Sequence, residues 1–220
     1  MEEAIVVVFT LLLLLTTFCL YKMLDKRGLY FALVIFHLIS FVLSFKISTV
    51  FKLNVNIGII PLIGIMTIFF LFTLKYGQKE KKNLLAITLY SNIITSLLFA
   101  IMIYFEQAIT ETISINMQGT FQYNYKILIA YPIIVCLSEY LSIKLFDLVN
   151  QIQTSILVSG VLTYIITGLI YTVGLYLLVY INILEVRYSL FVGITSYILG
   201  LALNIFNTYI LNLLVKKKVI

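Results

Sequence analysis

Two ionisable side chains lie well inside long apolar stretches of this sequence. His37 stands in "LVIFHLISF" and Glu139 stands in "IIVCLSEYLSIK". A titratable group is costly to place in hydrocarbon, and such groups commonly carry protons or bind solutes. Each also has a plainer interpretation, with His37 as a hydrogen-bonded packing residue and Glu139 as a protonated or water-linked carboxyl near the inner membrane interface. The sequence leaves both interpretations open.

Polar side chains also recur at helical spacing. One series comes every four residues and consists of Ser155, Ser159, Thr163, Thr167 and Tyr171. A second comes at three- and four-residue steps and consists of Gly193, Ser196, Gly200, Asn204 and Asn207. Each series falls on one slowly drifting helix face. Such a face serves helix–helix packing or lines a polar pathway, and the sequence alone does not separate the two.

The candidate solute-binding residues combine the embedded ionisable groups, the neighbouring hydroxyls and one lysine at a helix end. They are His37, Lys46, Glu139, Ser142, Ser159, Thr163 and Thr167. Lys46 has a plainer interpretation as well, because a lysine at a helix end can reach the interface without any further role.

Enzyme motifs are absent from the sequence. It contains no His-Glu-x-x-His, no Gly-x-Ser-x-Gly and no phosphate-binding loop, and it has one histidine in total. A metal site needs a cluster of histidine, cysteine or carboxylate ligands, and no single predicted helix carries one. We therefore expect no enzyme, no cofactor and no metal.

The elements that must position these residues are membrane helices. The chain is 62% hydrophobic and only 11% charged, and apolar runs long enough to span a bilayer recur along its length. We predict an all-α, polytopic integral membrane bundle of about seven transmembrane helices, forming a single domain over 1–220 with the lipid bilayer as its solvent and no nucleic-acid partner. The expected spans are 4–21, 29–45, 57–74, 84–105, 126–146, 155–181 and 188–213. Polar turns separate them, and the longest connection, 106–124 with Glu106 and Glu111, is expected to be a solvated loop, with a lid or an interfacial helix as alternatives.

The distribution of Lys and Arg predicts the orientation. With the N-terminus outside, 11 of the 15 basic residues face inward, and flipping the chain would reverse that bias. The inner set is Lys22, Lys26, Arg27, Lys75, Lys79, Lys81, Lys82, Lys144, Lys216, Lys217 and Lys218. We expect a multi-pass protein of the bacterial cell membrane with a cytoplasmic C-terminus.

Several turn sequences resemble a known family. "LYKMLDKRGLY", then Lys46 after an apolar run, then "VFKLNVNIG" and "FLFTLKYGQKE" resemble the bacterial queuosine-precursor transporters, also grouped under vitamin uptake transporters. The match runs without a gap from Tyr21 to Lys81, and "CLSEYLSIKLFDLV" and "TSILVSGVLTYI" look like later family segments. The resemblance implies a six-helix core behind an extra first helix, and uptake of 7-deazaguanine bases for tRNA modification.

The chain departs from that family at its polar positions. Phe69 and Phe70 stand where the family has Thr-Asp, and Leu74 stands where it has Glu. Glu139 and Ser142 replace Gln and Asp, while Gly160 and Thr163 replace Gln and Asp. We therefore expect a transporter with a changed, small aromatic or apolar solute. The alternative is a non-transporting membrane accessory, substrate-binding subunit or immunity-type protein on the same scaffold. In either case the candidate protein partners are a second copy of the chain or a membrane partner subunit.

Overall fold

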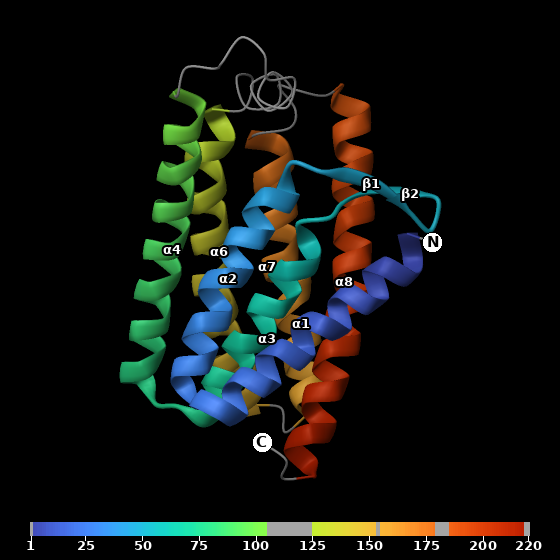
Figure 1. The fold of residues 1–220 in the computed structure, drawn as a ribbon. Coiled ribbons are helices and arrows are strands. Elements are labelled where there is room, and N and C mark those ends of the chain that lie inside the picture. The colour runs from blue at the N-terminus through green and yellow to red at the C-terminus, as the bar shows by residue number, and fades with distance from the viewer. Residues whose placement is uncertain (1, 105–124, 153–154, 179–184, 218–220) are drawn as a thin grey trace.

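The computed structural model describes residues 2–104, 125–152, 155–178 and 185–217. Within these ranges the chain forms seven helices and one β-hairpin (Figure 1). The helices are α1 (Glu2–Leu24), α2 (Lys26–Ser44), α3 (Ile59–Lys75), α4 (Gln78–Tyr104), α6 (Tyr125–Ile152), α7 (Ile156–Leu178) and α8 (Val186–Lys216), and the strands are β1 (Ile47–Val50) and β2 (Leu53–Asn56). The predicted outer loop 106–124, with Glu106 and Glu111, lies outside the described residues.

Six of the described helices are long and apolar enough to cross a membrane. Consecutive helices run in alternating directions, so the two ends of the chain lie toward opposite ends of the bundle (Figure 1). The structure therefore confirms the predicted all-α, membrane-spanning helical bundle. The remaining helix, α3, has 17 residues and extends about 26 Å at 1.5 Å per residue, slightly less than the thickness of a hydrocarbon core.

Helix α3 forms the centre of the bundle. All 14 residues from Ile59 to Phe72 are buried, as expected for a helix that is apolar on every side. Helices α1, α2, α6 and α8 pack around it. The ring of Phe70 stacks on Phe146 of α6 with 4.3 Å between ring centroids. Protein rather than lipid therefore covers most of this helix.

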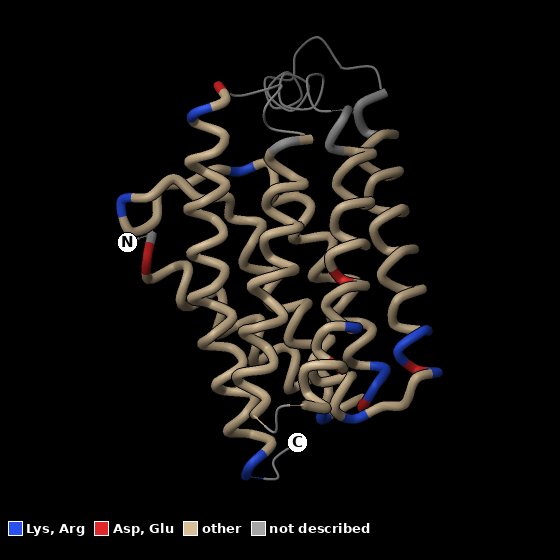
Figure 2. Tube along the Cα trace, turned by 180° about the vertical axis from the view of Figure 1, so that it is seen from behind, with Lys and Arg blue, Asp and Glu red and all other residues tan. Residues whose placement is uncertain are grey.

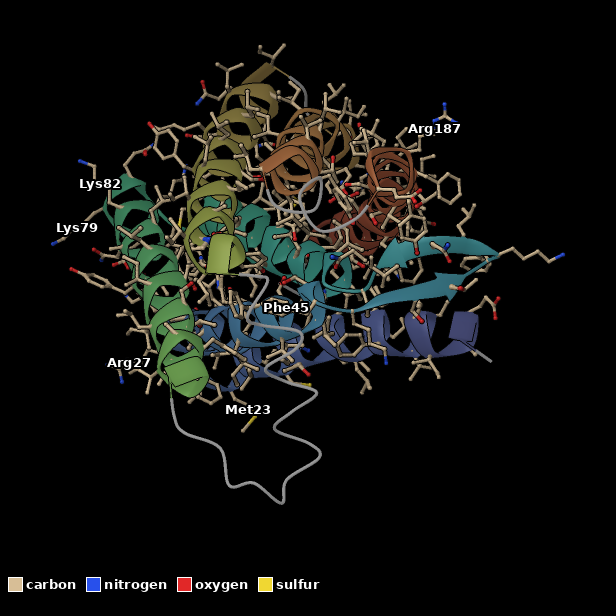
Figure 3. All side chains as sticks on the ribbon, turned by 90° about the horizontal axis from the view of Figure 1, so that it is seen from above. Met23, Arg27, Phe45, Lys79, Lys82 and Arg187 are labelled. Carbon is tan, nitrogen blue, oxygen red and sulfur yellow. The ribbon has the colours of Figure 1, made fainter. Side chains whose placement is uncertain are left out.

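Helix α1 lies at a slant across the outside of the other helices (Figure 3). Its outer face is exposed and apolar, with Ile5, Leu12 and Leu15 each more than half exposed. It ends at Leu24, and the φ of 51° at Asp25 turns the chain sharply into α2. The two helices meet closely at Gly28, where a Cβ would lie 2.0 Å from the Leu20 carbonyl oxygen. Only glycine fits this crossing.

The segment between α2 and α3, expected as a polar turn, is a β-hairpin. Strands β1 and β2 pair antiparallel, with Ile47 opposite Asn56 and Val50 opposite Leu53. Both turn residues, Phe51 and Lys52, have positive φ, as a two-residue hairpin turn of type I′ requires. The hairpin also binds α8, because the backbone N–H of Asn56 donates to Ser196 Oγ at 2.8 Å.

The lysine-rich stretch after α3, also expected as a turn, is mostly helix. Only Tyr76 and Gly77 are not helical, and they separate α3 from α4. Lys79, Lys81 and Lys82 belong to the start of α4. The turn expected between the predicted spans 126–146 and 155–181 is likewise helical as far as Ile152, because α6 continues through it. In both places, polar residues that were predicted to form a turn belong to a helix end.

Polar contacts join three helix ends around this break. Lys26 of α2 pairs with Glu80 at 2.9 Å, and Lys81 pairs with Asp147 of α6 at 2.9 Å. Tyr76 donates to Asp25. Burial, reinforced by that hydrogen bond, raises the pKa of Tyr76, so the phenol remains a donor. Charges gather at the two ends of the bundle and are scarce between them (Figure 2).

Candidate functional site

The structure brings His37 and Glu139 together inside the bundle. His37 Nε2 lies 2.9 Å from Glu139 Oε1, although the residues are 102 positions apart in the chain. Both side chains are fully buried. The amphipathic pattern of α2 explains the position of His37, which shares a buried face with Leu33, Phe36 and Ser40. The sequence predicted both residues as candidates but not their contact.

The hydrogen bonds of His37 define where its protons lie. Nδ1 is 2.7 Å from the carbonyl oxygen of Leu33, and a carbonyl can only accept, so Nδ1 carries a hydrogen. In a neutral ring Nε2 then has a lone pair, and a hydrogen bond to Glu139 requires a proton on the carboxyl group. In a charged ring Nε2 donates that same proton to a carboxylate. One proton lies between the two groups in either case, and the pair has no net charge.

Glu139 has a second oxygen with a different environment. Oε2 is buried and has no hydrogen-bond partner among the described protein atoms. An unpaired polar atom in a membrane interior costs on the order of 1–3 kcal/mol, and proteins commonly retain such atoms where a ligand or water completes the site. The pair therefore presents one acceptor that the protein does not satisfy.

Three further polar contacts position the helices around the pair. Ser138, next to Glu139, donates to the carbonyl oxygen of Thr167 at 3.1 Å and so joins α6 to α7. Tyr131, two turns earlier on α6, donates to Ser40 at 2.9 Å. Ser40 in turn donates to the carbonyl oxygen of Gly58 at 3.0 Å. Sequence reasoning did not select Tyr131, Ser40 or Ser138 as candidates, although each is a polar residue within an apolar run.

The predicted hydroxyl candidates are all buried, but most bond within their own helices. Ser142 donates to the Ser138 carbonyl at 2.8 Å, Thr163 donates to the Ser159 carbonyl at 2.8 Å, and Thr167 donates to the Thr163 carbonyl at 2.9 Å. Ser159 differs, because its buried hydroxyl has no partner among the described residues. The contact between Ser138 and Thr167 places part of this series beside the turn that carries Glu139.

Two buried amides on α8 belong to the second polar series. The amide nitrogen of Asn204 donates to the Gly160 carbonyl at 3.1 Å, and that of Asn207 donates to Thr67 Oγ1 of α3 at 3.2 Å. Helix α8 packs closely against Gly160, since a Cβ at this position would lie 2.3 Å from the Thr208 methyl group. These contacts support helix packing for this series.

Lys46 lies apart from the other candidates. It follows the end of α2, nine residues after His37, which corresponds to roughly 13 Å along a helix axis. Its side chain borders a cavity of about 370 Å³ between α1, the end of α2 and the hairpin. The predicted candidates therefore fall into two places. One is the region of His37 and Glu139, and the other is Lys46, at the end of the bundle opposite the lysine-rich helix break.

Comparisons with protein-family models, with curated proteins and with solved structures give no match for this chain.

Proposed function

We propose that this chain is a multi-pass membrane transporter whose solute-binding group is the His37–Glu139 pair. The observation that carries the proposal is the state of the Glu139 carboxyl group, with one oxygen bonded to His37 and the other buried without a protein partner. A neutral pair with a free acceptor is compatible with a membrane interior, because it exposes no uncompensated charge to hydrocarbon. In the cell we expect the N-terminus outside and the C-terminus in the cytoplasm.

The surroundings of the pair favour a small solute with an N–H donor and an apolar or aromatic body. An acceptor-only oxygen requires a donor from its ligand. Two buried aromatic rings lie on the same two helices, where Phe41 and Tyr131 meet edge to face with 5.0 Å between centroids. The resemblance of the turn sequences to queuosine-precursor transporters remains a prediction, and it makes 7-deazaguanines the first solutes to test.

Genetic complementation tests the solute. The chain is expressed in a bacterium that lacks both queuosine-precursor synthesis and its own precursor transporter, a 7-deazaguanine is supplied, and queuosine in tRNA is measured. We expect Glu139→Leu to abolish any restored queuosine, because leucine removes the acceptor oxygen that the solute N–H requires. Glu185→Leu is the matched control, since Glu185 is exposed and makes no side-chain capping bond. Absence of queuosine at normal membrane expression would exclude a 7-deazaguanine substrate.

A second function is favoured by the packing of the bundle. The central helix α3 is buried along most of its length, and the hydroxyls of Ser142, Thr163 and Thr167 are satisfied within their own helices. Both features suit a non-transporting membrane partner that retains a fold without a pathway. Purification in mild detergent distinguishes this case, because such a protein should co-purify with a stoichiometric membrane partner and take up no solute in liposomes.

A further inference from the structure

The cavity beside Lys46 is lined mostly by apolar side chains, with two polar residues among them. Its walls are apolar and come from four elements, with Val6 and Phe9 on α1, Leu43 on α2, Val50 on β1 and Ile60 on α3. Its polar lining residues are Lys46 and Ser48. With a volume of about 370 Å³, the cavity falls within the range of small-molecule pockets.

The fold explains why this space stays open. Helix α1 slants outward from the bundle, and the hairpin reaches across to the N-terminal part of α1 (Figure 1). Ile5, at the edge of the cavity, is 60% exposed, so the cavity opens toward the surroundings of the bundle. The lining side chains of α1, α2 and α3 belong to apolar helices, and the opening therefore faces the lipid region.

The charge at the mouth is positive. Lys46 is exposed, and no carboxylate among the described residues lies within ion-pair distance of its ammonium. Glu3, on the adjacent part of α1, is not one of the residues bordering the cavity. Lys46 follows the last turn of α2, a position from which a lysine reaches the membrane interface.

We propose that this cavity binds an anionic phospholipid of the surrounding bilayer. The headgroup phosphate lies against the Lys46 ammonium and the Ser48 hydroxyl, and an acyl chain lies along the apolar walls between α1 and α3. The arrangement of the lining supports this assignment. A cation and a hydroxyl donor at the interface match an anionic headgroup, and the apolar walls match an acyl chain. A lysine beside an anionic headgroup contributes about 1 kcal/mol of attraction near the membrane surface. The proposal does not depend on which solute the His37–Glu139 pair binds.

Native mass spectrometry of the full, delipidated chain tests the proposal. Phosphatidylglycerol and phosphatidylcholine with identical acyl chains are added in turn. We expect one phosphatidylglycerol to bind about fivefold more tightly than phosphatidylcholine, a ratio that follows from one lysine beside an anionic headgroup. Equal binding of the two lipids would overturn the proposal, and this comparison needs no variant.

Three variants locate the bound lipid. Lys46→Gln should remove the preference for phosphatidylglycerol and leave phosphatidylcholine binding unchanged. Lys52→Gln is the matched control, because Lys52 is exposed at the tip of the same hairpin but does not border the cavity, and it should retain the preference. Leu43→Trp fills the cavity from a half-buried position and should weaken binding of both lipids. Equal losses in the two lysine variants would show a diffuse surface charge instead of a site.

Inorganic phosphate distinguishes a lipid from a free anion. We expect phosphatidylglycerol, and not an equal concentration of phosphate, to raise the unfolding temperature of the wild-type protein. Equal stabilisation by both would mean that the cavity holds a free anion, and the lipid assignment would be wrong.

Discussion

His37 and Glu139 are hydrogen-bond partners inside the bundle, where the surrounding hydrocarbon contains no water to replace either of them. The His37 hydrogen bond to Leu33 assigns the proton on Nδ1, and so a single proton holds Nε2 and the carboxyl group together. Because the pair has no net charge, the full cost of burying an ion does not arise. The value of each residue for stability therefore depends on the presence of the other.

A double-mutant cycle measures this dependence. We expect His37→Leu and Glu139→Leu each to lower the free energy of unfolding by about 1–3 kcal/mol, because each leaves one buried polar group without its partner. The double variant should be less destabilised than the sum of the two, since no unpaired group remains. Unfolding in mixed micelles provides the free energies. Additive losses would contradict a direct coupling between the two side chains.

The sequence could identify these residues but not their arrangement. An ionisable side chain in an apolar run is visible from one segment alone, which is why His37 and Glu139 were predicted. Their contact depends on the rotation and depth of α2 and α6, and packing of the whole bundle decides both. The separation of Lys46 from the pair has the same origin.

At the scale of elements, the positions of the helices follow from local sequence. Apolar runs predict membrane helices because transfer of a helix into lipid depends mainly on that helix's own residues. The hairpin escaped prediction for a physical reason, since "ISTV" and "LNVN" are strands of four residues joined by Phe51 and Lys52. That turn lacks the Asn-Gly or Asp-Gly sequence typical of tight hairpins.

The strained hairpin turn predicts a stabilising double substitution. Phe51 and Lys52 adopt φ of 51° and 63°, which is unfavourable for most side chains. Asn and Gly adopt these angles more readily, so Phe51→Asn combined with Lys52→Gly should stabilise the protein by about 0.5–1 kcal/mol. A higher unfolding temperature in detergent is the expected result. A lower one would mean that the exposed Phe51 ring contributes more to stability than the turn costs.

The crossing of α1 and α2 predicts a substitution with the opposite sign. Gly28→Ala introduces a methyl group 2.0 Å from the backbone oxygen of Leu20, and backbone cannot move aside as a flexible side chain can. We expect a loss of about 1–3 kcal/mol, typical of overpacking. Gly77→Ala is the control, because nothing lies within 4 Å of a Cβ at Gly77. Equal stability of the two variants would show that α1 is free to move away from α2.

At the scale of the whole molecule, the helix break at Tyr76 and Gly77 connects charge distribution with packing. The lysines that bias orientation also build the contacts of this end, as Lys26 pairs with Glu80 and Lys81 pairs with Asp147. Lys79 and Lys82 instead point away from the bundle (Figure 3). The same short stretch therefore holds three helix ends together and leaves excess positive charge in solvent, where the positive-inside bias acts.

This arrangement predicts which side of the membrane each end occupies. In a variant without Cys19 and Cys136, single cysteines replace the exposed Lys79 or the exposed Lys52. A membrane-impermeant thiol reagent applied to intact cells should label Lys52→Cys at once and Lys79→Cys only after lysis, because the end with more Lys and Arg remains in the cytoplasm. The cysteine-free chain controls for background labelling. The reverse pattern would place the lysine-rich end outside and contradict the predicted orientation.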